Sequence, residues 1–312
     1  MEIVSYAMGE GAGYDEGFKA GQDSDAYQEG YNDGESAGYE QGHEQGYEEG
    51  YEAFNEYIRS YKGTLSYLFA KTNTSNNVPA FITNEQLKKM LRFNIKNYCN
   101  DKNDASFMFL NQYLLTEIPE FDISGYTNLT CLFGAVSNNG YRAIFNRGGT
   151  PPLLDTSEAR YINFMFAGSS LSSDDLSYNN MIAVPLYDFR KVNNARGLFF
   201  KCKQLKEIPA FNFYSISSTT YNFSYANSQS TDDWLRGCSN LERIHIVDIH
   251  YNFNISQAEV TKLDREALVE IIGNLRDMTG STAKTLTMGA TNLAKLTEDD
   301  IAVATDKNWT VS

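Results

Sequence analysis

Apolar residues recur along this chain in a pattern whose parts keep a fixed distance. An aromatic residue preceded by an apolar one is followed, ten positions later, by a proline within an apolar triplet. Phe133 and Phe166 begin two longer copies, and Leu235 begins a copy in which His245 takes the proline position. The offset of ten joins three pairs, which are Phe69 and Pro79, Phe109 and Pro119, and Phe199 and Pro209.

The anchor residues that open these copies are separated by 40, 24, 33, 33 and 36 positions. A repeat of this length is one supersecondary unit, which cannot bury its apolar face alone and must stack on its neighbours. The pattern therefore predicts a stacked array with the anchor side chains in one interior column. The anchors are Phe69, Phe109, Phe133, Phe166, Phe199 and Leu235.

The segment 83–99 interrupts the repeat and carries a helical pattern. Thr83 and Gln86 match a capping box, in which each side chain bonds the backbone N–H of the other residue. Leu87 and Leu91 follow at a spacing of four, which places them on one helix face. The sequence therefore predicts an inserted helix near 83–99.

The last part of the chain, 263–312, predicts an atypical terminal unit. Asp264 and Thr297 are candidate N-caps of two helices, and short strands are expected over 285–288 and at the edge over 309–311. A stack needs such a unit to shield its last apolar face. The apolar residues expected to cover that face are Leu268, Ile271, Ile272 and Leu275.

Glycine recurs at every fourth residue through much of the first sixty residues. A spacing of four marks one helix face, yet each glycine costs about 0.8–1 kcal/mol relative to alanine within a helix. A helix over about 26–61 therefore needs a close neighbour, which is a second copy, another protein, or a helix over 13–22. A disordered acidic tail is the alternative. The expected helix–helix and oligomer interface consists of Gly30, Gly34, Gly38, Gly42, Gly46 and Gly50.

Charge separates the N-terminal part from the rest of the chain. Residues 1–60 hold fifteen acids and two bases, whereas the remainder holds 25 acids and 24 bases. Such asymmetry indicates different roles, namely attachment or oligomerisation for 1–62 and a repeat array for 63–262. With a net charge of −14 and no basic patch, nucleic acid is not an expected partner.

Membrane insertion and export are not expected from the sequence. No apolar run approaches the roughly 18 residues that a transmembrane helix needs. The acidic beginning of the chain, 1–6, lacks the basic and apolar regions of a secretory signal.

The sequence predicts no enzyme, no catalytic or metal-binding residue and no cofactor. It contains no phosphate loop, dinucleotide fingerprint, zinc spacing or Gly-x-Ser-x-Gly motif. His250 and Asp248 with a nearby serine match a triad by composition, but serine and aspartate are common here. Cys202 and Cys238 each lie three residues after an anchor, which predicts stacked core residues and leaves a disulfide between neighbouring units open.

Tyrosines in or beside polar inserts form the candidate binding surface. The inserts over 169–180 and 215–230 are rich in Ser, Asn and Tyr, and such inserts lie on one side of a stacked array. Tyrosine gives rigid contact area at low entropic cost, although a core position explains half or more of these residues equally well. The candidates are Tyr178, Tyr187, Tyr214, Tyr221, Tyr225 and Tyr251.

Two segments carry a resemblance to a known family. The rows 198–209 and 235–244 resemble the BspA-type leucine-rich repeat, whose row is aromatic-Gly-Cys-x-x-Leu-x-x-Ile. Over roughly 64–312 this resemblance implies an α/β fold, an irregular leucine-rich-repeat solenoid with a C-terminal capping unit. Long inserts and missing glycines depart from the family row. The preceding glycine-stripe segment is similar to the Gly-x-x-x stretches of the Yae1/Lto1 adaptor proteins.

The resemblance also implies a function. BspA-type repeats occur in bacterial surface adhesins and in proteins of gut bacteriophages, and the segments 263–269 and 285–293 resemble the closing segment of the phage versions. The implied protein is a non-enzymatic bacteriophage virion component of a tail or fibre, or a receptor-binding protein, made in the bacterial cytoplasm. Its partners would be its own copies or other virion proteins, and a host-surface glycan or protein. A bacterial surface adhesin, a cytoplasmic adaptor and a glycan hydrolase are the alternatives.

Overall fold

The structure is a computed structural model of the chain. The chain divides into two compact units, residues 1–62 with 73–79 and residues 63–72 with 80–312. All described residues belong to the second unit, so the predicted glycine-stripe interface from Gly30 to Gly50 lies outside them. The described residues are 65–66, 68–70, 83–91, 99, 103–135, 142–169, 178–216, 233–257 and 259–312.

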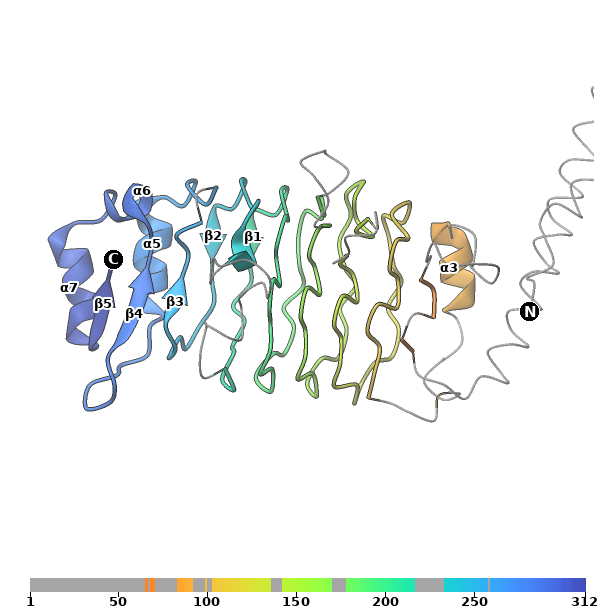
Figure 1. Cartoon of the computed structure of the whole chain (residues 1–312), viewed down its shortest axis with the longest axis horizontal. Helices are drawn as coiled ribbons and strands as arrows, with labels where there is room; N and C mark the ends of the chain where they lie inside the picture. The colour runs from red at the N-terminus through yellow and green to blue at the C-terminus, as the bar shows by residue number, and fades with distance from the viewer. Residues whose placement is uncertain are drawn as a thin grey trace, which may run out of the picture. The chain divides into compact units, whose positions relative to one another are not determined.

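Regular helices and strands are short and gather toward the C-terminus of the described chain (Figure 1). The helices are α3 (Asn84–Met90), the 3-10 helix η3 (Asp233–Leu235), α5 (Arg265–Gly273), α6 (Ala290–Leu293) and α7 (Glu298–Asp306). The strands are β1 (Glu207–Ile208), β2 (Arg243–Ile244), β3 (Phe253–Asn254), β4 (Lys284–Thr287) and β5 (Trp309–Val311). β1 pairs with β2, and β3, β4 and β5 form a second sheet in that order, with every pairing parallel.

Parallel pairing extends beyond these strands as isolated bridges. Asp104, Asn128, Tyr161 and Asn194 are linked one to the next at intervals of 24, 33 and 33 residues. These intervals equal those between the anchors Phe109, Phe133, Phe166 and Phe199. Figure 1 shows successive segments side by side, from the yellow region to the blue C-terminal elements. Each segment therefore meets the next in the same register.

Backbone hydrogen bonds hold this register at the anchors themselves. The N–H of an anchor donates to the carbonyl of the residue that precedes the next anchor. The bond from Phe199 N–H to Trp234 O shows that Leu235 is the counterpart of Phe199 in the next segment, because Trp234 directly precedes Leu235. The bonds run from Phe69 to Met108 (2.9 Å), Phe133 to Met165 (2.9 Å), Phe166 to Leu198 (3.2 Å) and Phe199 to Trp234 (3.2 Å).

The anchor side chains form one interior stack, as the repeat offset predicts. All five rings and Leu235 are at most 1% exposed. The rings lie within the range at which offset stacking is favourable, so the column adds ring–ring attraction to apolar burial. Successive centroid distances are 5.5 Å for Phe69–Phe109, 6.1 Å for Phe109–Phe133, 6.1 Å for Phe133–Phe166 and 5.4 Å for Phe166–Phe199.

Three residues after an anchor, a side chain donates to the carbonyl of the preceding anchor. This bond satisfies a backbone acceptor in the core, which would otherwise be costly. The thiols of Cys202 and Cys238 therefore have the same structural role as the amide of Gln112. All four cysteines are free, so no disulfide joins neighbouring units. The bonds are Gln112 Nε2 to Phe69 O (2.8 Å), Cys202 Sγ to Phe166 O (3.1 Å) and Cys238 Sγ to Phe199 O (3.0 Å).

Two residues before an anchor, the backbone enters the left-handed region. The φ values are +57° at Phe107, +53° at Cys131, +54° at Phe164 and +57° at Gly197. This conformation costs about 1–2 kcal/mol for a residue with a Cβ, and the stack imposes it repeatedly. At Gly197 a Cβ would also lie 2.2 Å from Cε1 of Phe164, so the ring of one segment requires glycine in the next.

The inserted helix and the C-terminal helices begin as the sequence predicts. Thr83 and Gln86 exchange the two bonds of a capping box, at 2.9 and 3.2 Å, and α3 follows directly. The Asp264 carboxylate accepts from the N–H of Ala267 at 2.8 Å, which caps α5. Thr297 opens α7 with a further capping box. α5 ends at Gly273, and α6 was not predicted.

The C-terminal elements bury the face that was expected to cover the stack. Leu268, Ile271, Ile272 and Leu275 are at most 3% exposed. α5 contacts α7 and β2, and Arg265 on α5 binds Asp300 on α7 through two nitrogens at 2.8 and 2.7 Å. β5 is an edge strand of its sheet, as predicted.

Replacement of Gly197 by alanine should destabilise the chain more than the same change at Gly125. Both glycines have positive φ, but nothing lies within 4 Å of a Cβ built on Gly125. We expect Gly125→Ala to cost about 1–2 kcal/mol from backbone strain and Gly197→Ala about 2–5 kcal/mol, because overpacking adds to the strain. Urea unfolding followed by circular dichroism measures both changes. Equal costs would contradict the predicted clash with Phe164.

The thiols of Cys202 and Cys238 should resist modification in the native protein. Burial raises the pKa of Cys238 to about 12 and that of Cys202 well above its ordinary value. Because the thiolate is the reactive species, a disulfide reagent at about pH 8 should leave both unlabelled. Peptide mapping by mass spectrometry, with a urea-unfolded sample as the fully labelled control, measures this. Rapid native labelling of either cysteine would show that its position is not core.

Candidate binding surface

Two of the candidate surface tyrosines belong to the core, which corrects the sequence-based prediction. Tyr187 is 2% exposed and its hydroxyl donates to the carbonyl of Pro152 at 2.6 Å. Tyr251 is 1% exposed. Burial raises the pKa of both hydroxyls above the ordinary value. The stack needs large side chains at these positions, and composition alone does not distinguish a core tyrosine from a surface one.

The remaining candidate tyrosines differ in how far they are exposed. Tyr178 is half-buried, with the ammonium groups of Lys201 and Lys203 at 5.7 and 5.0 Å from its ring centroid. Tyr214 is 61% exposed, and the guanidinium of Arg276 lies 5.4 Å from its ring centroid. Tyr221 and Tyr225 lie outside the described residues. Among the described candidates, Tyr214 is thus the one with a largely exposed ring.

Asp248 and His250 are not arranged as parts of a triad. The Asp248 carboxylate accepts from Nε and Nη2 of Arg276 at 2.6 and 2.5 Å, and this pair lowers the pKa of Asp248. Nδ1 of His250 lies 2.9 Å from the backbone oxygen of Asp248, not from its carboxylate. The carboxylate therefore orients Arg276 rather than an imidazole.

An exposed aliphatic strip is the main surface feature that the sequence analysis missed. Leu153, Ile182 and Leu186 are 57, 62 and 59% exposed, which makes them the three most exposed large aliphatic residues of the described chain. Leu153 and Leu186 are equivalent positions, each directly after a proline. Their segments are held together by the Tyr187–Pro152 hydrogen bond, so the two leucines lie on neighbouring segments. A position after proline was the available signal, but it does not say which face is exposed.

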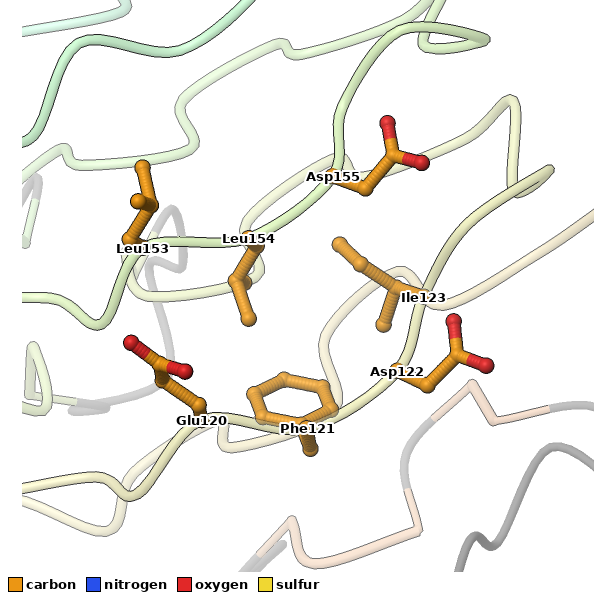
Figure 2. A pocket seen from close by; sticks show the side chains of 7 residues that line it. All are labelled: Glu120, Phe121, Asp122, Ile123, Leu153, Leu154 and Asp155. Carbon is orange, nitrogen blue, oxygen red and sulfur yellow. The ribbon is translucent and has the colours of Figure 1, made fainter.

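A shallow hollow lies beside Leu153, which is one of the residues that line it (Figure 2). Its volume is about 350 Å³. Two neighbouring segments line it, 120–123 and 153–155. Glu120 and Leu153 lie at one end, Asp122 and Asp155 lie at the other, and Phe121 and Leu154 lie between them.

The aspartates beside the hollow repeat from segment to segment. Asp122, Asp155 and Asp188 each accept a hydrogen bond from the N–H two residues later, at 2.9, 3.0 and 3.1 Å. Such a turn holds each carboxylate in a fixed direction. Asp188 is also paired with Arg190, which lowers its pKa. The residue at the position of Arg190 is serine in the two earlier segments.

A second hollow, of about 420 Å³, carries charges of both signs. It is lined by Glu207, Glu242, Arg243, Lys262 and Asp264. Arg243 pairs with Asp264 at 2.7 Å, and Lys206 lies 3.6 Å from Glu242. These internal pairs satisfy much of its charge, which makes it a weaker candidate than the first hollow.

Neither a metal site nor a membrane span is found in the part of the chain that the structure describes. There, three or more His, Cys, Asp or Glu side chains do not converge as ligands of an ion. The helices described are too short or too polar to cross a bilayer.

Comparison with known proteins gave no match. A scan against protein-family models, a search of curated proteins and a search of solved structures each found nothing similar to this chain. The resemblance to BspA-type repeats therefore stays a prediction.

The Asp248–Arg276 pair should give the chain a pH-dependent increment of stability. Because the folded pKa of Asp248 is lowered, the increment is present above the unfolded value of about 3.9 and is lost as pH falls through the folded pKa. We expect Arg276→Met to lower the melting temperature at about pH 7 and to have little effect near pH 2. Arg160→Met, at an exposed arginine, is the control. An equal effect of Arg276→Met at both pH values would contradict the assignment.

Proposed function

We propose that this chain is a non-enzymatic virion protein of a bacteriophage, in which a leucine-rich-repeat solenoid serves as a binding scaffold. Residues 1–62 attach it to other copies or to other virion proteins, and the solenoid presents a surface to a partner. The parallel segments, the common register and the interior ring stack support the solenoid. The virion assignment is supported by the resemblance of the repeats and of the closing segment to phage proteins.

The observation that carries the binding role is the regular exposure of equivalent positions. Glu120, Leu153 and Leu186 occupy the same place in three successive segments and are all exposed. In a parallel array, neighbouring segments are about 4.8 Å apart, so such positions form a column with fixed spacing. The core restrains the backbone, while the residue type at these outward positions differs from segment to segment. A scaffold of this kind is suited to protein or glycan recognition on the host surface.

Fractionation of a culture that produces the phage tests the virion assignment. We expect an antibody against the recombinant chain to detect it in the gradient fractions that contain capsid protein, because a virion component sediments with the particle. A chain that lacks 1–62 should remain in the soluble fraction, since the attachment segment is gone.

Other distributions would support the alternatives. Recovery with the cell envelope would favour a surface adhesin, and recovery of the full chain in the cytoplasm alone would favour an adaptor. Either result would overturn the virion assignment. An unrelated cytoplasmic protein of the host is the control for carry-over between fractions.

A further inference from the structure

We propose that the hollow beside Leu153 docks an extended segment of a partner protein in which basic residues adjoin apolar ones. The inference rests on the proposal that the chain is a binding scaffold, and it names the partner chemistry of one surface. The docking surface consists of the aliphatic strip (Leu153, Ile182 and Leu186) and the acidic hollow lined by 120–123 and 153–155.

The apolar part of the partner follows from the exposed leucines. Leu153 and Leu186 lie side by side on segments that the Tyr187–Pro152 bond joins, and each is more than half exposed. Leu154 beneath them is 6% exposed and continues into the core. Covering such leucines removes apolar surface from water at roughly 25 cal/mol per Å². A purely polar partner would not gain this energy.

The basic part of the partner follows from the charge around the hollow. The two segments 117–125 and 150–157 contain four acids and no Lys, Arg or His. Glu120 lies at one end of the hollow, and Asp122 and Asp155 lie at the other (Figure 2). Glu120 and Asp122 are two residues apart on one extended segment, which is about 6.6 Å. One lysine or arginine of a partner can therefore reach either end of the hollow. A basic group here meets complementary charge beside an apolar surface.

The same charges disfavour other occupants. Anionic glycans, nucleic acids and membranes with acidic headgroups would be repelled by the carboxylates. Neutral glycans are commonly bound on exposed aromatic rings, whereas the largely exposed side chains of this surface are aliphatic and its one ring, Phe121, is half-buried. The N-terminal segment of a second copy is itself strongly acidic, with fifteen acids against two bases over 1–60. A basic and apolar protein segment is the occupant that fits both features.

A displayed library of random nonapeptides, selected on the immobilised full chain, tests the inference. We expect enrichment of peptides in which Lys or Arg lies within two residues of Leu, Ile, Val or Met. Selection on Leu153→Ser/Leu186→Ser should not enrich them, because the apolar contact is lost. No enrichment on the unmodified chain, or enrichment of acidic peptides, would overturn the proposal.

Affinity measurements on the best selected peptide then separate docking from general attraction to an acidic protein. Glu120→Gln/Asp155→Asn removes two charges at the hollow and should weaken binding about fivefold or more. The matched control, Glu298→Gln/Asp306→Asn, removes two exposed charges on α7 and should change little. Val269→Ser/Val303→Ser is the matched control for the leucine pair. Equal losses in site and control variants would refute a specific docking site.

Two further measurements, of variant stability and of binding to other ligands, complete the test. Thermal unfolding of every variant shows whether the exposed substitutions leave the fold intact, and asparagine at position 155 retains the oxygen that accepts from Ser157. Binding of a glycan array or of phosphatidylglycerol vesicles that is lost in the same site variants would overturn the peptide assignment. Particle fractionation does not depend on this surface, so failure of the docking proposal and failure of the virion proposal give different results.

Discussion

The described part of this protein depends on a backbone hydrogen bond that recurs at four of the anchors, Phe69, Phe133, Phe166 and Phe199. The N–H of one anchor meets the carbonyl that precedes the next anchor, and this sets the register between segments. A slip by one residue would turn the core side chains of a paired extended segment toward solvent, because side chains alternate along an extended chain. In this register the phenylalanine rings of neighbouring segments stack. Parallel pairing and ring stacking therefore stabilise each other.

The common register imposes local conformational costs on the residues of the interior. Left-handed backbone recurs two residues before the anchors, even at Phe107 and Phe164. Carbonyls turned into the core are satisfied by Gln112, Cys202 and Cys238, whose donors differ in chemistry but occupy the same place. At Gly197 the ring of Phe164 leaves no space for a side chain. These local costs are borne because the stacked neighbours fix the conformation on both sides.

The same register organises the surface. Equivalent outward positions form columns, so Glu120, Leu153 and Leu186 lie in one row and Asp122, Asp155 and Asp188 in another. Between the two rows, the half-buried Phe121 and the buried Leu154 line the hollow in Figure 2. Local turns direct the carboxylates, and Asp188 is paired with Arg190 of its own segment. A regular core thus produces a surface whose chemistry changes from segment to segment while its geometry does not.

The sequence by itself determined the anchors, the capping boxes and the buried face of α5, because periodicity and capping are local signals. It placed Cys202 and Cys238 in equivalent slots, but only the tertiary structure showed what their thiols bind. Tyr187 and Tyr251 were assigned to the surface because composition does not encode burial. Leu153 and Leu154 are adjacent and chemically identical, yet one is exposed and the other buried. That choice is made by the neighbouring segments, whose packing lies far away in the sequence.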